Sequence, residues 1–330
     1  MEVQRKLFDV IQKIIPTNDL LANTISKLLN ISESAAYKRI RGDQSLTLDE
    51  FYVLCDHFHL SLDSLLRGEN ACQFDCVYKP VNSPDEYRNY MLFLLKNFDR
   101  QSASGNLSIL MSATDIPLFH LLPHKELRFF KLYTWAQSVY NYVGSLEEFF
   151  KEMETPEVLT AHDTITRDYG FIPSTEIWTG RTIEPTLKLI EYYIEINMFT
   201  SKDLPLALCK QLLSILDKLQ QWVENGHKED CSATFQLYES ELDLENTYYL
   251  VKRTEHSNCF VKLFTINCFD VFDTEFCNEA ERWLTKLTQR SIPLCGSSEK
   301  ERVKFFASQR EKVMFLEEKI RNLKNFPLRT

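Results

Sequence analysis

Glycine is scarce in this chain, with only 8 among its 330 residues, about a third of the usual share. Glycine supplies the backbone freedom that irregular loops need, so this composition favours helices over glycine-rich loops. No two glycines lie close enough together to form a dinucleotide-binding fingerprint or a phosphate-binding P-loop. The sequence therefore excludes the commonest nucleotide-binding motifs.

Long apolar runs are missing as well. None reaches the roughly 18 residues that a membrane-spanning helix requires. The first residues include Glu2, Arg5, Lys6 and Asp9, a charged pattern that is not typical of a signal peptide. We therefore expect a cytoplasmic protein that has no membrane partner.

The cysteines show no disulfide framework. There are nine, an odd and scattered number, which is typical of reduced thiols in a reducing compartment. Cys72 and Cys76 lie just beyond His57 and His59, so a zinc site can be imagined, but the spacing matches no common zinc pattern. We expect buried thiols and surface histidines, with no metal and no cofactor.

Enzyme motifs are absent too: the chain contains no Gly-x-Ser-x-Gly, His-Glu-x-x-His or Cys-x-x-Cys motif, and it lacks the set of motifs that marks a protein kinase. His120 and His124 are four residues apart, but Pro123 disturbs the helix that would align them as metal ligands. We expect both histidines at the surface or at a helix start. The sequence favours a protein that is not an enzyme, and an unrecognised C-terminal active site remains the least favoured class.

Caps and apolar periodicity predict a mostly α fold made of several parts. The first part is a five-helix domain over residues 1–68, whose last helix begins at Ser61 and ends at Gly68. A linker over 69–82 and a helical region over 83–228 follow, the latter with one short strand near 106–114 and a role in dimerisation or sensing.

The last part, residues 229–330, is expected to be a small α+β region. Aromatic and β-branched runs over 233–269 predict three strands of a short antiparallel meander. Helices are expected at 274–290 and after the capping box Ser298–Glu301. The final helix carries an apolar stripe (Val313, Leu316, Ile320, Leu323), which we interpret as a core face rather than a dimer seam.

The most specific pattern lies in residues 29–42. Asn30 stands where a tight turn needs a left-handed backbone, Ser32 is placed to cap the next helix, and Gly42 is placed to end it. Lys38, Arg39 and Arg41 put three cations on this one short helix. A turn followed by a short cationic helix is how a helix-turn-helix presents a helix to the major groove of DNA.

Residues 20–66 resemble the Cro/repressor-type helix-turn-helix family, within a chain that looks like the larger, mostly uncharacterised bacterial regulators. The family's turn is present as Leu29-Asn-Ile-Ser32 and its closing pair as Arg41-Gly42. The helix that follows in the family is present as Phe51–Leu54, and the family's hydrophobic-serine-hydrophobic-aspartate ending as Leu60–Leu65. The resemblance covers about a fifth of the chain. It implies a compact helical DNA-binding domain.

The resemblance also implies which residues touch DNA. Base edges would be contacted by Glu33, Ser34, Tyr37 and Lys38, and phosphates would lie near Arg41 and Gln44. Arg39 stands where the family usually buries an apolar residue, with Ile40 one place later. We therefore expect this helix to be rotated relative to the family, anchored by Ala36 and Ile40, with Arg39 exposed.

The charge balance opposes this interpretation. The net charge is −9, and residues 1–70 carry 8 Lys/Arg against 10 Asp/Glu, whereas affinity for DNA depends on neutralising phosphates. The cation cluster nevertheless favours a sequence-specific transcriptional regulator that binds double-stranded DNA as a homodimer and responds to a small-molecule or protein effector. The alternative is an adaptor whose helix-turn-helix docks on another protein.

Overall fold

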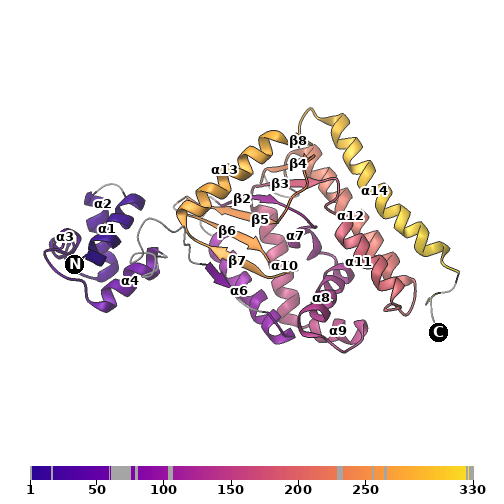
Figure 1. Cartoon of the computed structure of the whole chain (residues 1–330), viewed down its shortest axis with the longest axis horizontal. Helices are drawn as coiled ribbons and strands as arrows, with labels where there is room; N and C mark the ends of the chain where they lie inside the picture. Colours follow the sequence, from indigo (N-terminus) through magenta and orange to yellow (C-terminus); the bar gives the residue numbers. More distant parts are fainter. Residues whose placement is uncertain are drawn as a thin grey trace. The chain divides into compact units, whose positions relative to one another are not determined.

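A computed structural model of the chain describes residues 2–15, 18–58, 60, 76–78, 81–102, 107–228, 233–254, 256–263, 266–324 and 326. The chain divides into two compact units, residues 1–75 and 76–330 (Figure 1). Each unit has its own apolar core.

The first unit is helical. Its described helices are α1 (Glu2–Ile14), α2 (Asn18–Leu29), α3 (Glu33–Arg41) and α4 (Leu48–Phe58). Apolar residues spaced three or four apart on each helix meet in one core: Leu7, Phe8, Ile11, Leu21, Ile25, Ala36 and Leu54. The four expected helices are thus confirmed, while the fifth, expected over Ser61–Gly68, lies outside the described residues.

The second unit is built on a mixed sheet. Its strands are β1 (Cys76–Tyr78), β2 (Ser108–Ser112), β3 (Ser174–Thr179), β4 (Phe235–Ser240), β5 (Tyr248–Lys252), β6 (Ser257–Lys262), β7 (Cys268–Val271) and β8 (Ile292–Pro293). Across the described residues the order is β1-β7-β6-β5-β2-β3-β4-β8. β2, β3 and β4 are parallel, and every other neighbouring pair is antiparallel.

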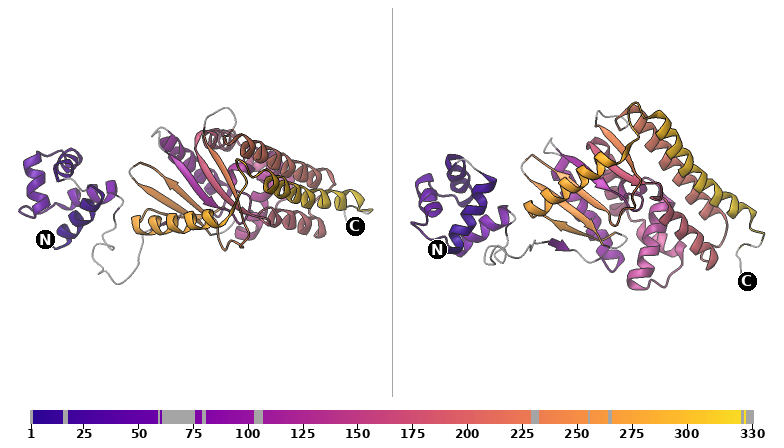
Figure 2. Two further views of the ribbon diagram at one scale, coloured as in Figure 1. Left: turned by 90° about the horizontal axis from the view of Figure 1, so that it is seen from above. Right: turned by 45° about the horizontal axis from the view of Figure 1, so that its top comes forward.

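Helices cover both faces of this sheet. The described helices of this unit are α6 (Pro84–Ser102), α7 (Leu118–Leu121), α8 (Lys125–Tyr140), α9 (Leu146–Met153), α10 (Pro156–Phe171), α11 (Glu184–Glu195), α12 (Asp203–Asn225), α13 (Thr274–Arg290) and α14 (Glu299–Asn322). Figure 2 shows α13 along one face, where Leu284 packs with Ile177 and Leu250. The opposite face carries the larger core.

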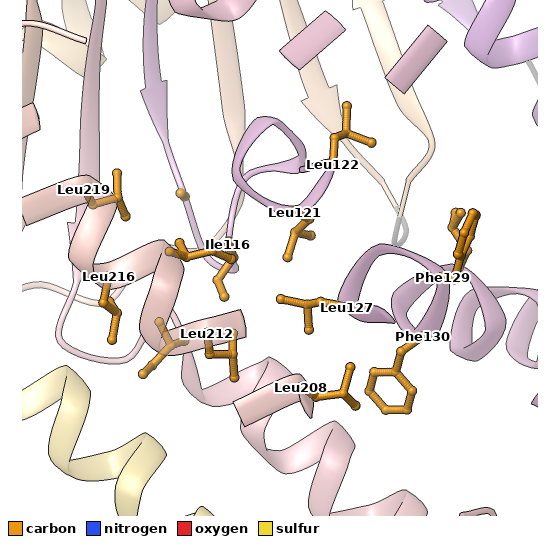
Figure 3. Close-up of a cluster of buried hydrophobic side chains, with 14 of the residues drawn as sticks. Ile116, Leu121, Leu122, Leu127, Phe129, Phe130, Leu208, Leu212, Leu216 and Leu219 are labelled. Atoms are coloured by element: carbon orange, nitrogen blue, oxygen red, sulfur yellow. The ribbon is translucent and has the colours of Figure 1, made fainter. Parts of the chain in front are cut away.

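That larger core joins α12 to α7 and α8. Leu208, Leu212, Leu216 and Leu219 form one stripe of α12 and belong to the same buried core as Leu121 and Leu127 (Figure 3). Val313, Leu316 and Ile320 of α14 belong to the same buried core, which confirms the expectation that this stripe is a core face. No described helix is long and apolar enough to cross a bilayer.

The sheet is larger than the short meander that we expected. The three strands expected over 233–269 correspond to β4, β5 and β6. Of these, β5 and β6 pair antiparallel as expected, and β7, which we did not predict, continues that meander. β4 instead pairs in parallel with β3, a second strand that we did not predict. The prediction also separated residues 83–228 from 229–330, whereas strands of both ranges pair in one sheet, with β2 and β3 between β5 and β4. Parallel pairing requires a long crossover, and α11 and α12 supply it between β3 and β4.

Two smaller expectations also differ. Residues 76–78, placed in the expected linker, form β1 and pair with β7 at the sheet edge. Helix α14 begins where the Ser298–Glu301 pattern places it, but the Ser298 side chain makes no capping hydrogen bond. The helix start follows from sequence there, whereas the cap does not.

Candidate functional site

The turn before α3 has the geometry that its residues predict. Asn30 adopts a φ of 52°, in the left-handed region that asparagine tolerates. Ser32 is the N-cap of α3, and its hydroxyl accepts a hydrogen bond from the Ala35 amide. Gly42 ends the helix with a φ of 80° and donates its amide to the Arg39 carbonyl. These local signals fix where α3 begins and ends.

One face of α3 is turned away from the core of the first unit. Glu33, Ser34, Lys38 and Arg41 are exposed and Tyr37 is half-buried. Their spacing of three to four residues places them on one side of the helix. The opposite side carries Ala36, which is fully buried, and Arg39. The structure therefore brings five of the six expected contact residues together.

Arg39 is not exposed as we expected. Only 7% of the residue is accessible, and its guanidinium donates Nε to Glu50 Oε2 (3.0 Å) and Nη2 to Glu50 Oε1 (2.7 Å). Nη1 donates to Gln44 Oε1 at 3.1 Å. A buried ion pair allows Arg39 to occupy an inward position that an apolar residue would otherwise fill. The expected anchors are confirmed, because Ala36 lies in the core and Ile40 packs against it.

Gln44, the sixth expected contact residue, lies in the loop after α3. Its side-chain carbonyl faces Arg39, and its backbone carbonyl accepts Nε2 of Gln4 at 2.8 Å. Gln4 also donates to the Arg39 carbonyl at 2.7 Å and accepts the Leu46 amide at 3.0 Å. Gln4, on α1, thus holds the loop that carries Gln44 against the first helix.

Charges on the exposed face of α3 are mixed. Lys38 is exposed, whereas Arg41 forms an exposed ion pair with Asp43 at 3.1 Å. Glu33 accepts a hydrogen bond from Asn23 Nδ2 at 3.0 Å. With Arg39 neutralised inside the unit, two cations of the expected cluster remain at the surface. The positive potential of this face is therefore weaker than the sequence indicates.

α4 fixes the partner of Arg39. Thr47 and Glu50 form a capping box, because the Glu50 amide donates to Thr47 Oγ1 and the Thr47 amide donates to Glu50 Oε2. Hydrogen bonding to Arg39 is the main cause that lowers the pKa of Glu50, against the opposing effect of burial. A single carboxylate thus caps α4 and anchors α3.

The second unit contains a buried polar cluster that we did not predict. His120 Nε2 lies 2.8 Å from Oε1 of Glu176, the fully buried centre of β3. Tyr169 donates to the same carboxylate, as does Trp178 Nε1 at 2.8 Å. Burial opposes ionisation of Glu176, but His120, the hydrogen bond from Tyr169 and the charge of Lys228 outweigh it and lower the pKa of Glu176. His120 is therefore buried, and its expected place at the surface is wrong.

Metal ligands are the remaining possibility for a site. Within the ranges that the structure describes, no group of three or more His, Cys, Asp or Glu side chains could hold a metal ion. His59 and Cys72, two members of the zinc pattern considered above, lie outside these ranges.

Comparison with protein-family models, with curated proteins and with solved structures gave no match for this chain.

Proposed function

We propose that the first unit binds double-stranded DNA through the exposed face of α3, and that the protein is a sequence-specific transcriptional regulator. In this proposal α2 and α3 act as a helix-turn-helix of the Cro/repressor type. α3 enters the major groove, Ser34, Tyr37, Lys38 and Glu33 meet base edges, and Arg41 and Gln44 lie near phosphates. A homodimer places two copies of α3 one turn of DNA apart.

The observation that carries the proposal is the division of α3 into two faces. Ala36 and Arg39 face the core, while Ser34, Lys38 and Arg41 are exposed on the other side of the helix. An exposed face with hydroxyl, ammonium and guanidinium donors provides the hydrogen-bonding groups that read base edges and hold phosphates.

Rigid placement of α3 supports the same function. The Arg39–Glu50 pair ties α3 to α4, and Gln4 ties the end of α3 to α1. A recognition helix must keep its orientation on the duplex, because each good base contact contributes only about 1–3 kcal/mol of discrimination. These two ties reduce the freedom of α3 that binding would otherwise have to remove.

A gel shift with genomic fragments at low and moderate salt tests the proposal. We expect the wild-type chain to shift a subset of fragments and Lys38→Ala plus Arg41→Ala to abolish the shift. The matched control is Arg5→Ala plus Lys13→Ala, which removes two exposed cations from α1. Equal loss in both double variants, or no binding by the wild type, contradicts DNA reading by α3.

The alternative is docking on another protein, and one observation favours it. Leu48 and Tyr52 lie one turn apart on α4 and are 83% and 68% exposed. Exposed apolar side chains of this size are typical of a contact surface. If the wild type binds no DNA and Leu48→Ser plus Tyr52→Ser releases a protein partner, the adaptor role replaces the regulator.

Location and regulation follow from the same proposal. A regulator that reads DNA acts in the cytoplasm of a bacterial cell. α3 lies in the first unit, so the second unit is free to dimerise and to bind an effector, either a small molecule or a protein.

A further inference from the structure

A pocket of about 200 Å³ opens in the second unit beside the buried His120–Glu176 pair. It lies between α7, the residues just before α8, the end of α10 and the second half of α12. Its lining consists of Phe119, His120, Pro123, His124, Thr166, Arg167, Tyr169, Gly170, Phe171, Ile215, Lys218 and Trp222. These residues come from segments far apart in the sequence, so the pocket is a product of the fold.

The charge of this lining is of one sign. Lys218 and Arg167 are its permanent cations, and the described lining contains no carboxylate. Burial, together with the charges of Lys218 and His120, lowers the pKa of His124 to about 4, so this imidazole is neutral at pH 7. Arg167 donates to Asp168 Oδ1 at 3.0 Å, and Lys218 Nζ lies 5.1 Å from the centre of the Trp222 ring. The pocket therefore favours an anion.

Two buried polar atoms of the lining have no hydrogen-bond partner among the described residues: Trp222 Nε1 and Thr166 Oγ1. The indole N–H can only donate, and Trp222 is 5% exposed. Buried donors are normally paired, and an unpaired one costs free energy that a bound acceptor recovers. Both atoms belong to residues that line the pocket, so a ligand with an acceptor oxygen would satisfy them.

The remaining walls are apolar. Phe119 stacks on Tyr169 with the ring centres 4.2 Å apart, and Phe171, at the end of α10, is 59% exposed. Ile215 and the Trp222 ring complete this side of the pocket. Apolar walls with a few convergent donors are typical of small-molecule sites. An inorganic anion would leave these walls in contact with water.

We propose that this pocket binds a small organic acid: a carboxylate attached to an apolar, aromatic or aliphatic body. The carboxylate lies near Lys218 and Arg167 and accepts hydrogen bonds from Trp222 and Thr166, while the body packs against Phe119 and Phe171. The binding stands on the pocket alone. Its role as the effector signal rests on the proposed function.

Calorimetry on the full chain tests this binding with four probes: phenylacetate, hexanoate and the neutral amide of each. We expect at least one carboxylate to bind, and its amide to bind about tenfold more weakly or worse, because the amide carries no charge. Dissociation constants above about 10 mM for both carboxylates overturn the proposal. Equal affinity of an acid and its amide overturns it as well.

Variants locate the bound acid. Lys218→Met is expected to weaken binding about tenfold, whereas Lys210→Met, an exposed lysine of the same helix outside the lining, leaves it unchanged. Trp222→Phe keeps an aromatic ring but removes the indole N–H donor, so we expect it to weaken binding of the acid more than binding of the amide. Thermal unfolding followed by circular dichroism checks that each variant is folded. Equal effects of Lys218→Met and Lys210→Met place the acid elsewhere and overturn the assignment.

These measurements do not require DNA. If the chain binds the acid but shifts no DNA fragment, the pocket proposal is supported and the proposed regulator function is overturned. If the chain shifts fragments but binds no acid, the regulator function is supported and the pocket proposal is overturned. If both bindings occur, the gel shift repeated with the acid tests whether the pocket affects DNA binding.

Discussion

Arg39 and Glu50 pair edge to edge, with two nitrogens of the guanidinium facing the two carboxylate oxygens at 2.7 and 3.0 Å. The side chains are 9% and 17% exposed, so the pair lies at the margin of the core of the first unit. The pair joins α3 to α4 across 11 residues of sequence. Removing one partner leaves the other charge partly buried and unpaired, which is the costly case for an ion pair.

We expect Arg39→Ala to destabilise the first unit by about 2–4 kcal/mol. The control is Arg41→Ala, which breaks the exposed pair with Asp43 and should cost less than about 1 kcal/mol. Native-state hydrogen exchange measures both, read on the amides of α3 and α4. Equal protection in the two variants would show that the Arg39–Glu50 pair contributes little.

The salt dependence of DNA binding gives a second prediction. The slope of log affinity against log salt falls by about one for each phosphate contact removed. If Lys38 contacts a phosphate, we expect Lys38→Ala to lower the magnitude of this slope by about one. If Lys38 reads a base, we expect Lys38→Ala to leave the slope constant and to relax the preference among DNA fragments. Arg5→Ala on α1 is the control. An effect of Lys38→Ala no larger than that of Arg5→Ala argues against contact by α3.

The oligomeric state follows from the proposed mode of binding. Light scattering of the full chain is expected to give twice the chain mass of 38.8 kDa, and footprints to show two half-sites one helical turn apart. A strict monomer, both alone and on DNA, rules out the dimer.

Acid should destabilise the second unit through His162, which is fully buried and lies 2.8 Å from the Tyr87 hydroxyl. Burial, with the charge of Arg128, lowers the pKa of His162 from 6.5 to about 3. The unfolded imidazole takes up a proton below about pH 6.5 and the folded one only near pH 3. Stability present above pH 6.5 is therefore lost as the pH falls toward 3, by up to about 1.4 kcal/mol per pH unit.

Tryptophan fluorescence measures this loss for the second unit alone, because all four tryptophans (135, 178, 222 and 283) lie beyond residue 75. His162→Gln has no titrating ring, so it should flatten the dependence of unfolding free energy on pH between pH 4 and 7, even where it lowers overall stability. His57→Gln, in the first unit, should leave it unchanged. An unaltered slope in His162→Gln would mean that this histidine does not titrate on unfolding.

Most of the features that could be predicted from the sequence depend on residues that are close together in the chain. Ser32, Asn30 and Gly42 act on neighbouring backbone groups, so the turn and the limits of α3 could be predicted from adjacent residues. The capping box of Thr47 and Glu50 was predictable for the same reason. The positions of the candidate contact residues on one exposed face also follow from helical spacing.

Contacts between distant residues could not be predicted in this way. Arg39 is buried because Glu50 and Gln44 reach it from beyond α3, and a pattern confined to one helix indicates only a cation. His120 and Glu176 are 56 residues apart. The pairing of β4 with β3 depends on two intervening helices, while the apolar alternation of β4 is the same in a meander or beside a parallel strand.

The strand order also has a consequence during synthesis on the ribosome. β1 is the first strand to emerge, yet its neighbour β7 is the seventh, and β2 lies between β3 and β5. The sheet can close only when residues up to about 293 have left the exit tunnel, whereas the described residues of the core shared by α1–α4 all lie at or before residue 60. The first unit is therefore expected to fold while most of the second is still unmade, and nascent β2 and β3 need protection from aggregation until their partners arrive.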